Sequence, residues 1–242
     1  GWRHSPAMQA YDLIVIGSGP AGRRAAVQAA KLKKSVLVVE KGQRVGGVCV
    51  HTGTIPSKTL RETVLNLSGW RERGFYGRAH RAKHDISAAD LRQRLSITLD
   101  HEVEVLKHQF ARNNVAWTTG TARFTDPNTI EVTHEGRIQR FVGDKFILAV
   151  GTAPYRPPHI PFDGETILDA DEILELKRLP RSLAVIGGSV IGIEYATIFS
   201  ALDVKVTVID PADRVLPFVD RELVDEFVHD MRDRGMTLRF ES

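Results

Sequence analysis

The sequence predicts an α/β fold in which one structural unit occurs twice. Each copy begins with a short apolar strand, Tyr11–Val15 in the first and Ser182–Ile186 in the second. Each strand runs into a glycine-rich turn, Gly17–Gly22 or Gly187–Gly192, which leads into a helical segment. Strand, glycine turn and helix in this order are the context that a dinucleotide-binding fingerprint requires. We therefore expect two Rossmann-like nucleotide-binding domains, the second of them incomplete.

Each glycine of the first turn has its own physical task. Gly17 permits the tight turn, and Gly19 lets the backbone approach a pyrophosphate. Gly22 allows a helix over Arg23–Leu32 to pack closely on the preceding strand. The free N–H groups at the start of that helix are expected to bind the phosphates of the nucleotide.

An acidic residue ends the second strand of each copy. The predicted strand Ser35–Val39 leads to Glu40, whose carboxylate can accept hydrogen bonds from the hydroxyls of an adenosine ribose. In the second copy a helix over Ile193–Ala201 precedes the strand Val204–Ile209, which leads to Asp210. Both carboxylates stand at the same spacing from the first glycine of their turn, so the two units are the same device used twice.

The segment that follows the first unit carries a family resemblance. Gly46-Gly47-Val48-Cys49, followed by Gly53-Thr54-Ile55-Pro56-Ser57-Lys58, resembles the FAD-containing pyridine nucleotide-disulfide oxidoreductases. In those enzymes two cysteines lie against the flavin. Here Thr54 takes the position of the second cysteine, and Cys49 is the only cysteine of the 242 residues. Thiol–disulfide exchange at this position is therefore excluded by the sequence.

A cysteine followed by threonine, with His51 between them, is similar to the Si-specific NAD(P) transhydrogenase branch of this family. The resemblance covers nearly the whole chain from Met8 onward. It implies a flavoprotein that transfers hydride from NADPH through FAD to NAD, with NAD(H) and NADP(H) as substrates. Two alternatives stay open: an NAD(P)H-dependent reductase of a quinone or dye, and a nucleotide-binding fragment without turnover.

The middle of the chain is expected to complete the first domain. Pro56 can open a helix over Ser57–Leu67, and an apolar stripe with helical spacing predicts a longer helix between Ser87 and Arg112. Turn residues then separate four short strands, which are Val115–Thr119, Thr129–Thr133, Ile138–Val142 and Lys145–Val150. Four prolines between Pro154 and Pro161 mark a linker.

The second glycine turn departs from the fingerprint. Ser189 takes the middle glycine position, where a side chain would crowd a pyrophosphate. The alternative is a Rossmann-like unit that packs well but binds nucleotide poorly. Asp210 favours the 2′-hydroxyl of NAD because its carboxylate would repel a 2′-phosphate. Lys205 and Arg214 are candidate contacts for the 2′-phosphate of NADP, or simply solvated charges.

The resemblance also assigns a catalytic pair. It places Lys58 beside flavin N5 and pairs it with Glu194, with an interdomain salt bridge as the alternative role. No metal site is expected, because Cys49 and His51 do not supply the three or four ligands that zinc needs. The expected cofactor-binding residues are Gly17, Gly19, Pro20, Ala21, Gly22, Glu40, Lys41, Gly47, Val48, Cys49, Thr54, Ser57, Lys58, Gly151, Gly187, Ser189, Val190, Ile191, Gly192, Glu194 and Asp210.

We expect an FAD-binding domain over residues 1–155 and an NAD(P)-binding domain over 156–242, in which Met236–Phe240 is the third strand. In the resembling family the chain continues beyond Ser242 and closes the flavin site. These 242 residues alone are therefore expected to hold FAD weakly, to aggregate and to be inactive, whereas the full-length protein is expected to be a homo-oligomer.

Composition fits a globular cytoplasmic enzyme. The chain is 42% hydrophobic and 26% charged, with a formal net charge of +3. Its basic residues are interspersed with acids, which disfavours a nucleic-acid-binding surface. Because no apolar run of the length of a membrane span and no leader pattern stands out, we expect neither a membrane-spanning segment nor a secretory leader. Pyridine nucleotides are the expected small-molecule partners, and neither nucleic acid nor a membrane is expected as a partner.

Overall fold

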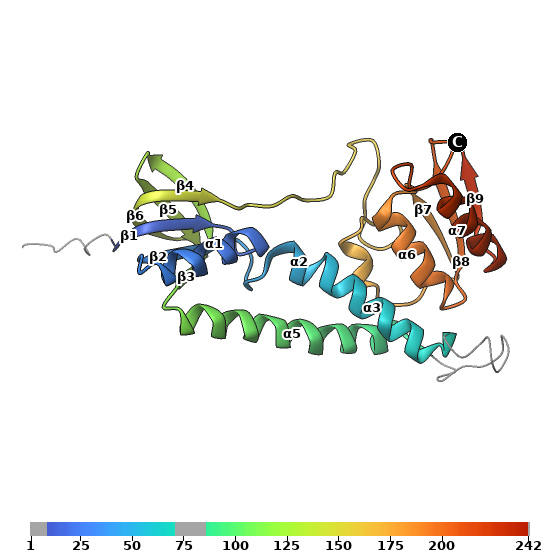
Figure 1. The fold of residues 1–242 in the computed structure, drawn as a ribbon, viewed down its shortest axis with the longest axis horizontal. Helices are drawn as coiled ribbons and strands as arrows, with labels where there is room; N and C mark the ends of the chain where they lie inside the picture. Colours follow the sequence, from blue (N-terminus) through green and yellow to red (C-terminus); the bar gives the residue numbers. More distant parts are fainter. Residues whose placement is uncertain (1–8, 71–85, 242) are drawn as a thin grey trace, which may run out of the picture. The chain divides into compact units, whose positions relative to one another are not determined.

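Figure 1 shows a computed structural model of the chain, in which residues 9–70 and 86–241 are described. Met8, where the predicted resemblance begins, lies outside these ranges. The chain divides into two compact units: the first comprises Gly1–Ile55 and Leu99–Ala153, and the second Pro56–Thr98 and Pro154–Ser242. The domain boundary between residues 155 and 156 stays a prediction, since these units additionally group the 56–98 segment with the carboxyl-terminal part.

A six-stranded sheet forms the first unit, in the order β3-β2-β1-β6-β5-β4. Neighbouring strands from β3 to β6 are parallel, whereas β6, β5 and β4 are antiparallel to one another. The strands are β1 (Gln9–Ile16), β2 (Val36–Glu40), β3 (Ala116–Thr119), β4 (Thr121–Asp126), β5 (Thr129–His134) and β6 (Arg137–Leu148). The parallel order brings the ends of β1 and β2 together, where the glycine turn and Glu40 lie.

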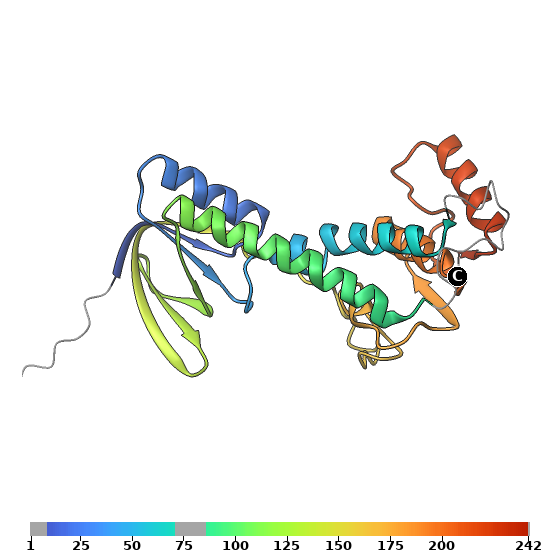
Figure 2. The same cartoon turned by 90° about the horizontal axis from the view of Figure 1, so that it is seen from below.

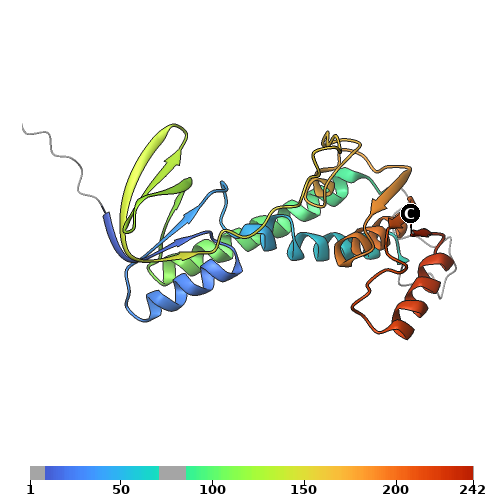
Figure 3. The same ribbon diagram turned by 90° about the horizontal axis from the view of Figure 1, so that it is seen from above.

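Both faces of this sheet are covered, which explains why β1 and β2 are continuous apolar runs. Val15 and Val38 face one core with α1 (Pro20–Lys31) and the latter part of α5 (Ala88–Arg112). Figure 2 shows these two helices on one side of the strands. Ile14 on the other face packs against residues of β5 and β6, the hairpin that curves away from α1 in Figure 3.

The first glycine turn has the geometry that its sequence predicts. Gly17 has φ +106°, a region that favours glycine, and a Cβ there would lie 2.1 Å from the Ala149 carbonyl oxygen. A Cβ on Gly22 would lie 1.9 Å from the Gly17 carbonyl oxygen, so only glycine lets α1 approach β1 this closely. The second unit repeats the contact, since a Cβ on Gly192 would lie 2.0 Å from the Gly187 carbonyl oxygen.

The second unit contains three parallel strands in the order β7-β8-β9. Their bounds are Ser182–Ile186, Lys205–Asp210 and Thr237–Phe240, which confirms three predicted strands. One apolar core joins β8 to α6 (Val190–Ser200), α7 (Arg221–Asp233) and α3 (Thr54–Leu67). Leu91 and Leu95 of α5 belong to this core as well, so the single apolar stripe predicted on that helix serves two cores.

Several predicted boundaries were wrong. Ile138–Val142 and Lys145–Val150 form one strand, β6, because its first part pairs with β5 while its later part pairs with β1. Helices α1 and α6 begin three residues earlier than predicted, so the last three residues of each predicted glycine turn form the first turn of the helix. The elements missed were β4, α2 (Gly47–His51), the 3-10 helix η2 (Glu172–Glu175) and α7.

A serine–carboxylate contact joins β1 to the start of β2 at the amino ends of these strands. The Asp12 carboxylate accepts hydrogen bonds from the Ser35 backbone N–H at 2.7 Å and from its hydroxyl at 2.8 Å. The Ser35 N–H and then its hydroxyl lower the pKa of Asp12 below its ordinary value of 3.8, with a smaller contribution from Lys34. Asp12 is therefore charged in the folded chain at neutral pH.

Replacing Asp12 by asparagine should destabilise the chain at neutral pH more than in acid. A carboxyl group whose pKa is depressed on folding stabilises the fold above its unfolded pKa and loses that contribution as the pH falls. The difference in unfolding free energy between the unsubstituted chain and Asp12→Asn should therefore be full at pH 7 and shrink below pH 3.8. A gap that grows on acidification in urea-unfolding curves would contradict this.

Replacing Gly22 by alanine should destabilise the first unit. The added methyl group gains about 1 kcal/mol of helix propensity. It meets the Gly17 carbonyl oxygen at 1.9 Å, however, and such overpacking costs about 1–3 kcal/mol or more. We expect thermal and denaturant unfolding to shift to milder conditions for Gly22→Ala, whereas exposed Arg24→Ala on the same helix should stay within about 0.5 kcal/mol. Equal stability of Gly22→Ala and the unsubstituted chain would refute the close contact.

Candidate functional site

A cavity of about 700 Å³ lies at the carboxyl ends of β1 and β2 in the first unit. Its walls are the glycine turn, the loop after β2, the start of α2, the start of β4 and the chain after β6. Residues predicted to bind a cofactor that line this cavity are Gly17, Gly19, Pro20, Ala21, Glu40, Lys41, Gly47, Val48, Cys49 and Gly151. Gly22 supports the cavity from behind, through the packing of α1 on β1.

Glu40 connects the turn to the loop that follows β2. Its Oε2 accepts hydrogen bonds from the backbone N–H of Ser18 at 3.0 Å and from the Ser18 hydroxyl. Its Oε1 accepts from the N–H of Gly42 at 2.8 Å. The carboxylate thereby holds the turn at the mouth of the cavity, next to the start of α1, where the helix dipole also favours negative charge.

The cavity has the shape and chemistry for a dinucleotide. Gly19 and Gly47 approach so closely that a Cβ on Gly47 would lie 2.7 Å from the Gly19 Cα. Gly19 itself has φ −63°, and its Cβ position is free of close protein contacts. Side chains are thus missing where a pyrophosphate would approach the start of α1, and Glu40 supplies a ribose acceptor. These residues fit the adenosine and pyrophosphate portions of FAD.

Cys49 lies on α2 at the wall of this cavity and is a free cysteine. His51, on the same helix, contacts the Val45 carbonyl oxygen through Nε2 at 3.0 Å, which is a local structural role. Thr54 begins α3, and the N–H of Gly53 is bonded to the Val48 carbonyl oxygen. Within the described ranges, no three or more His, Cys, Asp or Glu side chains gather as a metal site.

The second glycine turn repeats the arrangement of the first. Asp210, at the end of β8, accepts from the N–H of Gly188 through Oδ2 and from the N–H of Ala212 through Oδ1 at 2.7 Å. The predicted residues Gly187, Ser189, Val190, Ile191 and Gly192 form the turn and the start of α6, and Val190 and Ile191 are exposed.

Ser189 adopts an ordinary backbone conformation, with φ −86° and ψ −177°, and its side chain is exposed. The protein therefore accommodates the serine without strain, and the serine side chain would make a steric contact only with a bound nucleotide. Lys205 cannot assist Asp210, because the two lie at opposite ends of β8, roughly 16 Å apart at the rise of a strand. Arg214 follows β8 and donates to the Pro217 carbonyl oxygen at 2.9 Å.

Lys58 of α3 and Glu194 of α6 form an ion pair within the second unit. The lysine side chain is 62% exposed, whereas that of the glutamate is 16% exposed. Next to Glu194, burial and then the charges of Glu194 and Asp171 raise the pKa of Tyr195, so its phenol stays neutral at physiological pH. The pairing implied by the family resemblance is present, and its catalytic role stays a prediction.

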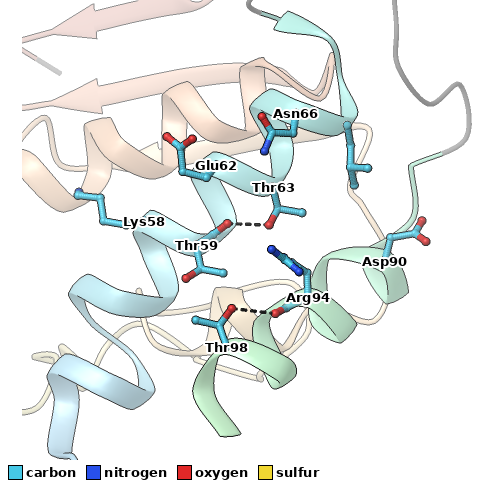
Figure 4. A pocket seen from close by; sticks show the side chains of 9 residues that line it. Lys58, Thr59, Glu62, Thr63, Asn66, Asp90, Arg94 and Thr98 are labelled. Atoms are coloured by element: carbon cyan, nitrogen blue, oxygen red, sulfur yellow. Dashed lines mark hydrogen bonds between the residues drawn. The ribbon is translucent and has the colours of Figure 1, made fainter. Parts of the chain in front are cut away.

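A second cavity, of about 560 Å³, lies between α3 and α5 in the second unit. Figure 4 shows Arg94 of α5 directed into it from the side opposite Thr59 and Thr63. Lys58 lines this cavity, not the one in the first unit. The hydroxyls of Thr63 and Thr98 donate to carbonyl oxygens of their own helices.

The structure thus groups most predicted cofactor residues at the two glycine turns. Thr54, Ser57 and Lys58 are not among the residues that line the first-unit cavity, and Ser57 and Lys58 belong to the second unit, so their contact with a flavin stays a prediction. Sequence reasoning missed Ser18, Gly42 and the start of β4 at Gly120–Ala122. Ser18 lies inside the fingerprint itself, which was the available signal. No sequence pattern indicated that the start of β4 lines the cavity, because that strand was not predicted.

Residues 11–242 match the family described as pyridine nucleotide-disulphide oxidoreductase. The chain belongs to this family. The family match and the two glycine turns agree on Rossmann-type nucleotide binding in an oxidoreductase. None of the helices in the described part of the chain is long and apolar enough to cross a membrane.

Its relatives include proteins named soluble pyridine nucleotide transhydrogenase. Those of Mycobacterium bovis and Mycobacterium tuberculosis are each 49% identical over 235 residues, and that of Chromohalobacter salexigens is 39% identical over 234. Each alignment covers 96% of this chain and 50% of the relative. The chain therefore spans about half the length of these relatives.

Two solved structures have the same fold. LpdA from Mycobacterium tuberculosis superposes with a TM-score of 0.85 at 26% identity, over 97% of this chain and 51% of that one. The HOCl-induced flavoprotein disulfide reductase RclA from Escherichia coli gives 0.81 at 28% identity, over 96% and 49%. Both similarities extend across the two nucleotide units.

Exchanging the residues at the middle positions of the two turns should change nucleotide affinity in opposite directions. Ser189→Gly removes an exposed side chain from the path of a pyrophosphate, so binding of NADH, followed by calorimetry, should strengthen. Gly19→Ser should weaken FAD binding without unfolding the unit, because position 19 has φ −63° and room for a Cβ. Unchanged or weaker NADH binding by Ser189→Gly would show that the serine hydroxyl is accommodated beside the pyrophosphate.

Proposed function

We propose that the first unit binds FAD. Support comes from the cavity at the ends of β1 and β2, the glycines that line it and the Glu40 carboxylate at its mouth. In this arrangement the N–H groups at the start of α1 bind the pyrophosphate, and Glu40 accepts from the adenosine ribose. When bound, FAD supplies a two-electron carrier that can accept a hydride from one nicotinamide and return it to another.

The second unit is the proposed site for the pyridine nucleotides. Its turn has the same glycine-to-carbonyl contact as the first, and Asp210 stands where Glu40 stands. The carboxylate favours the ribose of NAD(H), so NADP(H) must be bound in spite of this charge. Arg214 is the remaining candidate for its 2′-phosphate, because Lys205 lies at the wrong end of the strand.

The proposed reaction is hydride transfer between NADPH and NAD through FAD, as in a Si-specific transhydrogenase, without a redox disulfide. One observation carries it: Cys49 stands alone in the chain, with Thr54 where a second thiol would be needed. Electrons that cannot pass to a dithiol must leave to another nucleotide or an external acceptor. The relatives with 49% identity, named transhydrogenases, favour the nucleotide.

Lys58 and Glu194 have a proposed electrostatic role. The mostly buried Glu194 carboxylate fixes the position of the exposed Lys58 ammonium. A positive charge held this way can stabilise negative charge that develops during hydride transfer, and a fixed position avoids the cost of reorganisation. The pair also ties α3 to α6, so its structural and electrostatic contributions have to be separated by experiment.

An anaerobic titration of the full-length protein with NADPH and then with NAD⁺ tests the proposed reaction. We expect the flavin absorbance to bleach with NADPH and to return with NAD⁺. Neither lipoamide nor glutathione disulfide should reoxidise it. Cys49→Ser should keep measurable transfer from NADPH to NAD⁺, because no thiol chemistry is required, whereas a disulfide mechanism would lose all activity.

Two outcomes would replace the proposal. Reoxidation by quinones or dyes but not by NAD⁺ would identify an NAD(P)H-dependent acceptor reductase. Appreciable reduction of a disulfide substrate, abolished in Cys49→Ser, would show that thiol chemistry operates despite Thr54. A matched control is Arg24→Ala, an exposed change on α1 that touches neither nucleotide turn in this account.

A further inference from the structure

Ser18 is completely buried and connects three parts of the first unit. Its hydroxyl donates to Glu40 Oε2 and accepts a hydrogen bond from the backbone N–H of Gly46 at 2.9 Å. Its own backbone N–H donates to the same carboxylate oxygen at 3.0 Å. One serine therefore joins the glycine turn, the end of β2 and the loop that leads into α2.

The loop after β2 is held at both ends by this cluster. Gly42, at its start, donates to Glu40, and Gly46, at its end, donates to Ser18. The next residue, Gly47, meets Gly19 across the cavity mouth. The position of the Gly47 wall relative to the glycine turn thus depends on a bond made by the Ser18 hydroxyl.

In the second unit, the glycine turn and the loop after the second strand are connected without a side-chain hydroxyl. Gly188 replaces Ser18, and a Cβ there would lie 2.7 Å from Val215 Cγ1 and 3.0 Å from Asp210 Oδ2. The loop after β8 is instead fixed by the N–H of Leu216, which donates to the Gly188 carbonyl oxygen at 3.0 Å. The longer carboxylate side chain, Glu40, is paired with a serine in its glycine turn, whereas the shorter one, Asp210, is paired with a glycine.

We propose that Ser18 is a positioning residue for FAD, which fixes the 42–47 loop against the glycine turn. This rests on the proposed function of the first unit. Ser18 also occupies an acceptor site of Glu40: a carboxylate offers about four such sites, and the protein fills three of them. If the number of free acceptor sites on Glu40 determined the affinity for the ribose, removing the Ser18 hydroxyl would strengthen binding. If the position of the 42–47 loop determines the affinity, removing the hydroxyl would weaken binding.

The substitution Ser18→Ala tests whether the affinity for FAD rises or falls when the hydroxyl is removed. The variant leaves the buried Gly46 N–H without its acceptor and loses a bond to a charged group. We expect hydrogen exchange of the Gly46 amide, measured without FAD, to be at least about tenfold faster. The dissociation constant of FAD, measured by quenching of flavin fluorescence on the full-length apoprotein, should rise about tenfold.

Ser35→Ala is the matched control. It removes the other serine hydroxyl that is bonded to a carboxylate, that of Asp12, in the same unit but at the amino ends of the strands. We expect it to lower stability while the FAD dissociation constant stays within about twofold. Ser18→Gly, which copies position 188 of the second unit, serves as a second variant if Ser18→Ala fails to fold.

Three results would overturn the proposal: unchanged exchange at Gly46, an FAD affinity that is unchanged or tighter in Ser18→Ala, or an equal loss of FAD affinity in Ser35→Ala. A failure of the proposed function itself looks different, because the unsubstituted full-length protein would then not quench flavin fluorescence at all. That result would refute FAD binding by the first unit and, with it, the role of Ser18.

Discussion

In each unit, a carboxylate at the end of the second strand holds the glycine turn at the end of the first. Glu40 accepts from the N–H of Ser18, and Asp210 from the N–H of Gly188. Each carboxylate also accepts from an N–H two residues further along the chain, that of Gly42 or Ala212. Charge-assisted hydrogen bonds of this kind are stronger than neutral ones, so the turn and the loop beyond the second strand are fixed together.

The approach of helix to strand depends on the same turn. The carbonyl oxygen of Gly17 occupies the space that any side chain at Gly22 would need, and Gly187 stands in the same relation to Gly192. The helix therefore starts close to the carboxyl end of the strand, with its free N–H groups at the region where we propose that phosphates bind. The units differ in the loops around this shared frame, where Ser18 and Gly188 use different bonds.

The repeated strand, turn and helix were predictable from sequence because glycine spacing and apolar runs are local signals. Ser182–Ile186 is a strand with the predicted bounds, and the turn glycines lie as expected. The continuity of β6 was not predicted: one predicted strand ended at Val142 and the next began at Lys145, whereas pairing with both β1 and β5 keeps these residues in one strand. Lys205 failed as a phosphate contact because closeness in sequence does not reveal which end of a strand a residue occupies.

The sequence also could not show that the 42–58 segment contributes residues to both units. Cys49 lines the first-unit cavity, whereas Lys58, on the next helix, pairs with Glu194 in the second unit. Apolar packing of Leu60 and Val64 places α3 in the core of the second unit, which no local pattern in the sequence indicated. The expected position of Lys58 beside the flavin stays a prediction. The ion pair, by contrast, followed from the family resemblance and not from any local pattern.

The central claim is that one chain binds two different nucleotides, each at one copy of the same strand, glycine turn and helix unit. The most direct measurement is the stoichiometry of both nucleotides in the purified full-length protein: release and identification of the tightly bound cofactor, followed by calorimetric titration with NADH. The account predicts one FAD per chain and one further site that binds NADH while FAD stays bound. Two pyridine nucleotides per chain with no flavin, or competition between NADH and FAD for one site, would contradict it.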